Sequence, residues 1–322
     1  MKAIVFSEYG SPDGLRLCEV EPPVPKRDEV LVKVLAASIN DWDLGILRGA
    51  TLLDRLMHGL FRPKVRILGC DVAGRVEAVG EGVTAFQPGD EVFGDLCACG
   101  FGGFAEYVCA REGALALKPA GMTFEQAAAI PQAGMLALQG LRDAGHLQPG
   151  QRLLINGAGG GVGTFALQLA KEGGAEVTAV DRAEKLDLCR SLGADHVLDY
   201  AQADFTRTGQ RYDLILDVKT NRPVFAYLRA LRPRGTYVTV GGSLLRLLQA
   251  FLLGPWISRV HKKRIRIVAL KPNKDLAHMK DLFEAGKVVP VIEGPYALSE
   301  VPAALKVFER GDHQGKMIIT MA

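Results

Sequence analysis

The sequence predicts an α/β protein in which a doubly wound parallel sheet is joined to a second, β-rich domain. Residues 1 to about 120 contain many short strands with frequent turns, a pattern typical of a small barrel. From residue 124 onward, strands alternate with helices, as in a parallel sheet built from right-handed crossovers. We therefore expect the β-rich domain in residues 1–122 and 290–322, and the sheet domain in residues 123–289.

The strands expected in the β-rich domain are short, with Gly, Pro or Asp between them. They cover residues 3–6, 29–34, 74–79, 91–93 and 105–108. Near the end of the chain, a helix over residues 301–309 precedes a strand over residues 316–320. We expect this last strand to return to the first domain, which would make the sheet domain an insertion.

The sheet domain is expected to begin with helices over residues 124–130 and 134–144. Its strands lie near residues 152–156, 176–180, 196–198, 213–217, 236–240 and 265–270, with further helices over 164–172, 221–232 and 274–285. In a doubly wound sheet the ligand binds at the carboxyl ends of the strands. The residues that follow each strand are therefore the first candidates for a binding site.

One of these strands leads into a glycine cluster and then a helix. The cluster is Ala158, Gly159, Gly160, Gly161, Val162 and Gly163. Glycine allows a sharp turn and lets phosphate oxygens approach main-chain N–H groups, and the helix N-terminus adds unpaired donors. A second strand ends in Asp181, roughly 20 residues on, as dinucleotide-binding proteins require. The spacing G-x-G-x-x-G has Ala158 at its first position, so the match to the strict fingerprint is imperfect.

Composition excludes several classes of protein. The formal net charge is +3 and the Lys and Arg residues are spread along the chain, which argues against a nucleic-acid partner. No apolar run reaches the roughly 20 residues that span a bilayer, so we expect no membrane insertion. The N-terminus begins a strand directly and shows no secretory signal. The six cysteines include no C-x-x-C pair, so we expect reduced thiols and a cytoplasmic location.

Two stretches, 48–66 and 243–266, combine large apolar residues with Arg and Lys. Each is explained by a buried helix with a basic flank, by a helix on a membrane surface, or by a lid over an apolar cleft. Gly254-Pro255 is expected to break the second helix, which favours a wall or lid of the substrate cleft for 243–264. Phe251 and Trp256, together with Met135, are the predicted substrate-lining residues.

At this point the chain resembles a known family over essentially its whole length. It is similar to the medium-chain dehydrogenases/reductases of the zinc-independent quinone oxidoreductase (zeta-crystallin-like) branch. That branch's pattern is matched by Gly150-Gln151-x-x-Leu154-x-x-x-Ala158-Gly159-Gly160-Gly161-x-Gly163-x-x-x-x-Gln168-x-x-Lys171. Supporting segments are Ala37-Ser38-Ile39-Asn40-x-x-Asp43, Gly69-x-Asp71-x-Ala73-Gly74-x-Val76 and residues 193–200. The resemblance implies a GroES-like substrate domain, a Rossmann domain and a cleft between them.

The resemblance also bears on metal. Zinc-dependent relatives place a thiolate and an imidazole where this chain has Asn40 and Cys70. Zinc needs three protein ligands, Asn40 is a poor one, and Cys70 alone cannot hold the ion. We therefore predict no metal. The resemblance places Asn40 beside the nicotinamide, as a polar group that positions the reactants, so it is the predicted catalytic residue.

The residues leave the choice between NADPH and NADH open. Asp181 suits the ribose hydroxyls of NADH and would repel a 2′-phosphate. Arg182 follows it, however, and Lys185 and Tyr200 have the spacing of the pair that binds the 2′-phosphate in similar NADPH enzymes. Three further residues at strand ends are predicted to contact the cofactor: Lys219, Gly241 and Gly242.

The predicted function is transfer of a hydride from NAD(P)H to a quinone or an α,β-unsaturated carbonyl. Without a metal, nothing obvious lowers the pKa of an alcohol, whereas a polarised electrophile accepts a hydride directly. Two alternatives stay open: a zinc-free NAD(P)-dependent alcohol or aldehyde dehydrogenase, and a non-catalytic nucleotide-binding protein. The expected partners are a small hydrophobic electrophile and a second copy of the chain, paired through the strands at 236–240 and 265–270.

Overall fold

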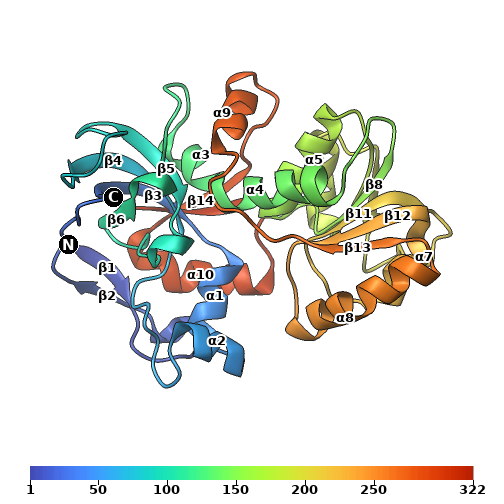
Figure 1. The fold of residues 1–322 in the computed structure, drawn as a ribbon, viewed down its shortest axis with the longest axis horizontal. Helices are drawn as coiled ribbons and strands as arrows, with labels where there is room; N and C mark the ends of the chain where they lie inside the picture. Colours follow the sequence, from blue (N-terminus) through green and yellow to red (C-terminus); the bar gives the residue numbers. More distant parts are fainter. Residues whose placement is uncertain (322) are drawn as a thin grey trace. The chain divides into compact units, whose positions relative to one another are not determined.

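The computed structural model describes residues 1–321, apart from the side chains at positions 53, 54 and 244. Within it, the chain forms two compact units (Figure 1). The first contains Met1–Gln132, Pro272–Glu284 and Pro290–Ala322, and the second contains Ala133–Lys271 and Ala285–Val289. The units differ from the expected domain ranges at residues 123–132 and 272–284, which belong to the first unit.

Packing and hydrogen bonds explain why these two segments belong there. Helix α3 (Phe124–Ala129) packs on strands β3 (Glu29–Ser38) and β4 (Asp71–Val79) of the first unit. Asn273 forms a two-way bond with the backbone of Asp95, whose N–H donates to Oδ1 at 2.8 Å and whose carbonyl accepts from Nδ2 at 2.9 Å. Such contacts between distant residues are not visible in local sequence patterns.

The main sheet of the first unit has seven strands among the described residues, in the order β14-β15-β3-β4-β5-β7, with β6 paired to β3. Val30, Val32 and Val34 alternate inward along β3 and are buried in its core. The expected return of the last strand is confirmed, because β15 pairs antiparallel with β3. The other strands of this sheet are β5 (Glu91–Asp95), β6 (Tyr107–Arg111), β7 (Ala116–Leu117), β14 (Ile292–Ala297) and β15 (Lys316–Thr320), while β1 (Lys2–Val5) and β2 (Arg16–Glu19) pair with each other in a separate sheet.

Two helices of the first unit, α3 and α10, pack against this sheet. α10 turns an apolar side, with Val301, Ala304 and Leu305, into the core of the unit. The helices are α1 (Asp41–Arg48), α2 (Leu52–His58), α3, α9 (Leu276–Glu284) and α10 (Val301–Arg310). Helix α4 (Pro131–Gln139) starts at the boundary between the units and continues into a π-helical turn over Gly140–Ala144.

The second unit is built on a six-stranded parallel sheet, in the order β10-β9-β8-β11-β12-β13 within the described residues. The doubly wound sheet predicted from the sequence is therefore confirmed. Its helices lie on both faces, with α5 on one and α8 on the other (Figure 1). The elements are β8 (Arg152–Asn156), α5 (Gly161–Glu172), β9 (Glu176–Asp181), α6 (Leu186–Ser191), β10 (His196–Asp199), β11 (Tyr212–Asp217), α7 (Val224–Ala230), β12 (Leu231–Thr239), α8 (Leu244–Val260) and β13 (Arg264–Ile267).

The expected helix break at Gly254-Pro255 is wrong. α8 runs without interruption for 17 residues, with Pro255 inside it. Ala250 and Ile257 are buried on one side of the helix, in the core cluster that also contains Ile265 of β13. Packing along β13 therefore outweighs the single hydrogen bond that a proline removes.

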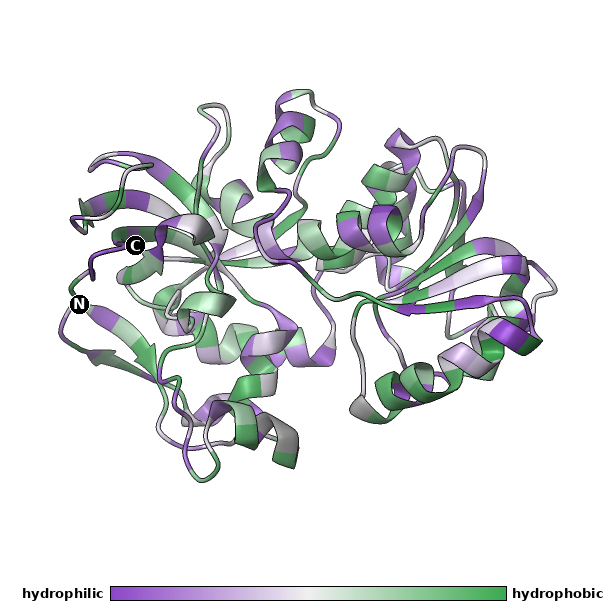
Figure 2. Cartoon of the chain, in the orientation of Figure 1, coloured by the Kyte–Doolittle hydropathy of each residue, from purple (hydrophilic) through white to green (hydrophobic). Residues whose placement is uncertain are grey.

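The outer side of α8 is apolar and exposed. Its side chains include Leu245 and Phe251, each 70% exposed, and Trp256, 51% exposed. Figure 2 shows hydrophobic colouring along much of this helix. The helix over 243–264 is therefore buried on one side only, against β13, and exposed on the other.

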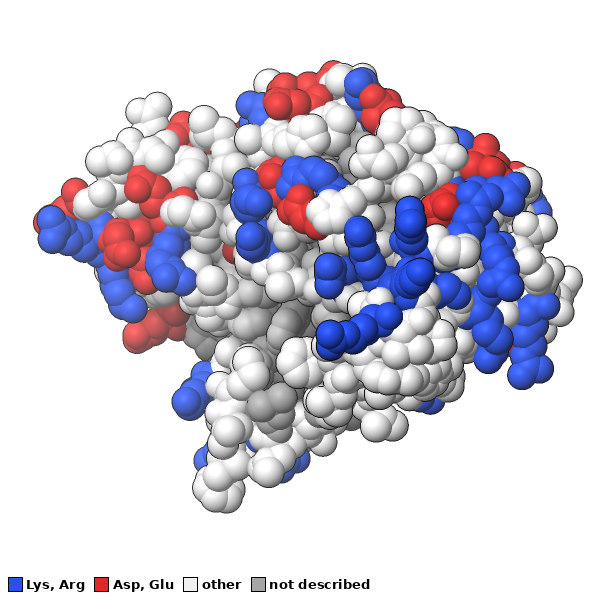
Figure 3. Space-filling view, turned by 45° about the vertical axis from the view of Figure 1, so that its right-hand side comes forward, with Lys and Arg blue, Asp and Glu red and all other residues white. Residues whose placement is uncertain are grey.

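Exposed basic residues lie at the end of α8 and just after it: Arg259 in the last turn of the helix, Lys262 in the connection, and Arg264 at the start of β13. Lys and Arg also gather on the right-hand side of Figure 3. Among the described residues, no helix is long and apolar enough to cross a membrane.

Candidate functional site

The loop between β8 and α5 requires glycine for steric reasons. Gly157 has φ +87°, in the left-handed region that favours glycine. A Cβ at Gly163 would lie 2.1 Å from the carbonyl oxygen of Gly157, so no side chain fits there. Gly160 is the N-cap of α5 and has one neighbouring atom near its Cβ position, at 3.7 Å. The structure thus requires glycine at 157 and 163 and places glycine at the N-cap, position 160; the G-x-G-x-x-G spacing, with Ala158 at its first position, does not include Gly157.

The predicted loop residues lead into the N-terminus of α5. Ala158 is buried and its N–H donates to the carbonyl of Val180 at 3.2 Å. Gly161 and Val162 open α5, whose first-turn N–H groups have no partner within the helix. Gly159 donates its N–H to Oδ2 of Asp181 at 2.7 Å. The loop and the acid at the end of β9 therefore meet, as predicted.

The structure gathers the four residues expected around the adenosine ribose. The carboxylate of Asp181 also accepts the N–H of Arg182 at 2.9 Å. The Nε of Arg182 donates to the hydroxyl of Tyr200 at 2.9 Å, and the N–H of Tyr200 donates to the carbonyl of Asp181. Lys185 is buried, and its Cβ lies 2.7 Å from the place a Cβ would take at Gly159. Two cationic residues and one carboxylate thus share this end of β9.

A buried polar set lies next to the loop, at the ends of β8 and β11. Asn156 donates its side-chain N–H to Asp217 at 2.7 Å, and Tyr237 donates its hydroxyl to the other carboxylate oxygen at 2.7 Å. Burial raises the pKa of Asp217. Asn156 and Tyr237 were missed by sequence reasoning, because each lies on a strand and has no sequence motif of its own.

The remaining predicted cofactor residues lie at the neighbouring strand ends. Cγ of Lys219 comes 3.1 Å from the Cβ position of Gly157, so this lysine lies against the glycine loop. Gly242, at φ +130°, is packed so closely against Thr220 that a Cβ would lie 2.5 Å from the threonine Cβ. Gly241 accepts a hydrogen bond from the Thr239 hydroxyl.

These features fit a dinucleotide. The loop leaves room near Gly160, where a side chain would otherwise stand, and it is followed by the N-terminus of a 12-residue helix. Phosphate oxygens bind favourably at such a position. The carboxylate of Asp181 lies at the end of the second strand, and in folds of this kind an acid at that position binds the ribose hydroxyls of the dinucleotide.

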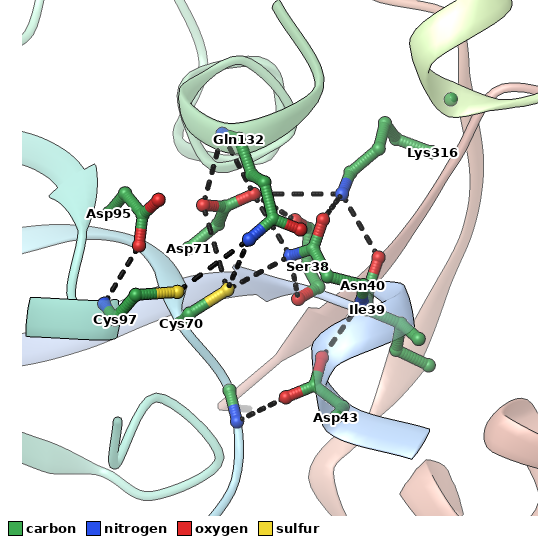
Figure 4. Close-up of polar contacts among 12 residues, drawn as sticks. Ser38, Ile39, Asn40, Asp43, Cys70, Asp71, Asp95, Cys97, Gln132 and Lys316 are labelled. Atoms are coloured by element: carbon green, nitrogen blue, oxygen red, sulfur yellow. Dashed lines mark hydrogen bonds and ion pairs between the residues drawn. The ribbon is translucent and has the colours of Figure 1, made fainter. Parts of the chain in front are cut away.

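A second polar cluster is buried in the first unit, around Asn40 (Figure 4). Asn40 is the N-cap of α1 and is 5% exposed. Its Oδ1 accepts a hydrogen bond from Nζ of Lys316 at 2.6 Å, and its Nδ2 donates to Oδ2 of Asp71 at 3.0 Å. An ammonium on one side and a carboxylate on the other therefore fix the orientation of the amide.

Asp71 is the central anion of this cluster. It accepts hydrogen bonds from the Ser38 hydroxyl at 3.1 Å and from the N–H of Gln132 at 3.2 Å. Nζ of Lys316 lies 3.6 Å from its Oδ2. Burial raises the pKa of Asp71 to about 6, while the positive charge of Lys316 acts in the opposite direction. The sequence indicated none of these partners, because Ser38, Gln132 and Lys316 are far apart along the chain.

Asp43 forms the base of the cluster. Its carboxylate accepts the N–H of Asn40 and the N–H of Gly69, each at 2.8 Å. These bonds connect the start of α1 with the segment before β4. Burial raises the pKa of Asp43 to about 7 despite both hydrogen bonds.

Cys70 lies next to polar side chains that sequence reasoning did not predict. Nε2 of Gln132 lies 3.5 Å from the sulfur of Cys70 and 3.6 Å from the sulfur of Cys97. Cys70, Asp95 and Cys97 each offer a ligand atom, and these atoms all lie within 4.8 Å of one another. The premise that Cys70 stands alone as a possible ligand is wrong, because the turn after β5 brings Cys97 back beside it.

The predicted substrate-lining residues have different environments. Met135 is fully buried in α4, and Asn40 is buried in the first unit. Phe251 and Trp256 lie on the exposed side of α8, where Trp256 meets Phe225 edge-on at 6.5 Å between ring centroids. The structure thus brings together the loop and adenosine residues within the second unit, while Asn40 belongs to the first unit and Met135, Phe251 and Trp256 to the second.

Comparison with known proteins places these observations in context. A family model described as the alcohol dehydrogenase GroES-like domain matches residues 26–120, and one described as a zinc-binding dehydrogenase matches residues 192–319. The chain is 34% identical over 330 residues to 2-methylene-furan-3-one reductase of Solanum lycopersicum, covering 99% of this chain and 79% of that protein. It is 32% identical, with the same coverage, to the NADPH-dependent alkenal/one oxidoreductase of Arabidopsis thaliana. The quinone oxidoreductase structure from Coxiella burnetii has a TM-score of 0.87 and 28% identity, covering 100% of this chain and 99% of that one.

Zinc, which the second family description names, does not fit at Asn40. The carbonyl oxygen of Asn40 already accepts a hydrogen bond from the Lys316 ammonium, so a cation there would face another cation. The neighbouring set of Cys70, Asp95 and Cys97 has the sulfur and oxygen donors that zinc takes in proteins. Among the described residues, that set is therefore the better candidate for a metal.

Proposed function

Because the chain belongs to the medium-chain dehydrogenase/reductase family, in its zinc-independent quinone oxidoreductase branch, we propose that it transfers a hydride from NAD(P)H to a quinone or an α,β-unsaturated carbonyl. The observation that carries the proposal is the glycine loop of residues 157–163 joined to Asp181 by the Gly159 hydrogen bond. This arrangement suits a dinucleotide, and two relatives are named for enone-type acceptors.

The proposed cofactor is NADPH or NADH. The first turn of α5 would bind the pyrophosphate, and the end of β9 would bind the adenosine ribose. Arg182 and Lys185 favour a 2′-phosphate there, whereas Asp181 favours free ribose hydroxyls. When bound, the cofactor supplies the hydride. The protein binds and orients the cofactor and the acceptor, and it excludes competing reactions.

Asn40 is the proposed positioning residue for the reaction. Lys316 holds its amide oxygen and Asp71 holds its amide nitrogen, so the group cannot turn without breaking a charge-assisted hydrogen bond. Hydride addition to an enone or quinone leaves an oxyanion, which takes a proton from water or from a side chain. In this proposal the chain needs no metal for hydride transfer.

The acceptor is proposed to be a small hydrophobic electrophile. The apolar outer side of α8, with Phe251 and Trp256, supports the proposal that this helix forms an apolar wall for a flat acceptor. Met135 is also proposed to line the acceptor site. The exposed basic residues after the helix would remain in water. A membrane surface is the competing partner for this helix.

The decisive experiment compares acceptors in protein that has been treated exhaustively with a chelator. We expect oxidation of NADPH or NADH that depends on an added quinone or enone. Turnover of simple aldehydes or alcohols alone would instead identify a zinc-free alcohol or aldehyde dehydrogenase. Tight cofactor binding with no turnover of any acceptor would identify a non-catalytic nucleotide-binding protein.

We also propose a cytoplasmic homodimer. Strand β13 is the edge of the six-stranded sheet, and its free side offers backbone groups for pairing across a two-fold axis. β12, also proposed from the sequence, is bonded on both sides by β11 and β13, so β13 alone of the two carries the proposed contact. Free thiols at all six cysteines support a reducing compartment. Sedimentation as a monomer at micromolar concentration would refute the dimer.

A further inference from the structure

Three potential ligands converge beside the Asn40 cluster because of strand pairing in the first unit. β4 and β5 are antiparallel, and their register places Asp71 opposite Asp95. The N–H of Leu96 donates to the carbonyl of Cys70 at 2.7 Å, which continues this pairing past the end of β5. Cys70, Asp95 and Cys97 are therefore held at one point by backbone geometry (Figure 4).

One atom of this group lacks a partner. Asp95 is fully buried, and its Oδ1 accepts the N–H of Cys97 at 2.8 Å. Its Oδ2 is buried and has no hydrogen-bond partner among the described residues. A buried polar atom without a partner is unfavourable, and more so if it carries charge. The carboxylate of Asp95 therefore keeps one oxygen unpaired inside the first unit, next to the thiols of Cys70 and Cys97.

We propose that Cys70, Asp95 and Cys97 form a site for a thiophilic divalent cation such as Zn²⁺ or Cd²⁺. Two sulfurs and one carboxylate oxygen supply three ligands, and the fourth tetrahedral position is left for water. Binding replaces the two thiol protons, which pass to solvent, and gives the buried carboxylate of Asp95 a cationic partner. No change of oxidation state is involved.

This site is separate from the Asn40 amide. Lys316 holds the carbonyl oxygen of that amide, while Asn40 and Gln132 present N–H groups to the sulfur of Cys70. Such N–H groups are suitable supporting donors for a metal-bound thiolate. The inference rests on side-chain placement in the first unit and does not rest on the proposed hydride transfer.

The test is a cadmium titration of the full-length protein, stripped of metal and kept reduced. We expect one Cd²⁺ per chain after gel filtration, with an ultraviolet thiolate-to-cadmium absorption band. Cys97→Ser and Asp95→Asn should each weaken binding by more than the ~10-fold typical of losing a supporting partner. Asp95→Asn preserves the shape of the side chain, so it remains informative should Cys97→Ser fold poorly.

Cys18→Ser is the matched control, since it removes the exposed thiol, which would bind cadmium adventitiously. It should leave both stoichiometry and affinity unchanged. The proposal is overturned if the absorption band disappears with Cys18, if no band forms, or if Cys97→Ser and Asp95→Asn bind as tightly as the unmodified chain.

Discussion

Lys316→Met tests the role of the buried ammonium in the Asn40 cluster. The Lys316 side chain is 4% exposed, and its Nζ donates to Oδ1 of Asn40 at 2.6 Å and to the carbonyl of Ile39 at 2.9 Å. It lies 3.6 Å from the Asp71 carboxylate. Methionine preserves most of the volume while removing the charge and all of these donated hydrogen bonds.

The expected loss of stability follows from that geometry. Two unit charges 3.6 Å apart interact by about 5 kcal/mol at an effective dielectric constant of about 20. Breaking a buried ion pair by removing one partner is typically destabilising by about 3–5 kcal/mol, because the other charge stays buried. We therefore expect the first unit to lose about 3–5 kcal/mol. Asp71→Asn added to Lys316→Met should recover part of that loss.

Guanidinium unfolding measures this loss in the unit concerned. The chain has two tryptophans, Trp42 in α1 and Trp256 in α8. In a Trp256→Phe background, the fluorescence of Trp42 reports the unfolding of the first unit. Lys306→Met, which removes an exposed lysine that pairs with Asp13, is the control and should change little. A Lys316→Met midpoint no lower than that of the control would refute the reasoning.

Three further predictions concern other parts of the molecule. Burial raises the pKa of Asp43 from 3.8 to about 7, so the folded state holds this proton more tightly than the unfolded state. As the pH rises from 4 to 7, the free energy of unfolding should therefore fall more steeply in the unmodified protein than in Asp43→Asn, as measured by denaturant titration at each pH. Parallel curves would contradict this. Asp181→Ser should raise the ratio of kcat/KM for NADPH to that for NADH, and Lys185→Ala should lower it, each by the factor that corresponds to about 1–2 kcal/mol. An unchanged ratio would exclude both residues from the ribose pocket. Phe251→Ala or Trp256→Ala should raise KM for a bulky quinone more than for a compact one, whereas equal effects together with loss of vesicle binding would favour a membrane role for α8.

The sequence predicted best what is encoded locally. The strand, glycine cluster and helix around residues 152–172 are contiguous, so their order and spacing predict both the loop and its ligand. Asp181 was found for the same reason, since one strand and one helix fix its distance from Gly159. Gly157 was missed, although its spacing from Gly160 and Gly163 carried the signal.

Long-range contacts could not be predicted in this way. Asn40, Asp71 and Lys316 lie in three different parts of the chain and meet through the pairing of β3 with β4 and β15, and Gln132 joins them from the start of α4. Nothing near Lys316 in sequence distinguishes it from a strand-end lysine in solvent. The continuous helix through Pro255 has the same origin, because packing on β13 outweighs the local preference of Gly254-Pro255 for a break, and the predicted break was therefore wrong.

The central claim is tested most directly by following the transferred hydrogen. NAD(P)H carrying deuterium at both C4 positions of the dihydronicotinamide is incubated with the protein and an α,β-unsaturated ketone, so that either face of the ring delivers the label. The account predicts a saturated ketone with one deuterium on the carbon β to the carbonyl, while the hydrogen added at the α carbon comes from water. An unlabelled product, deuterium on the carbonyl carbon, or no consumption of cofactor with either enones or quinones would contradict it.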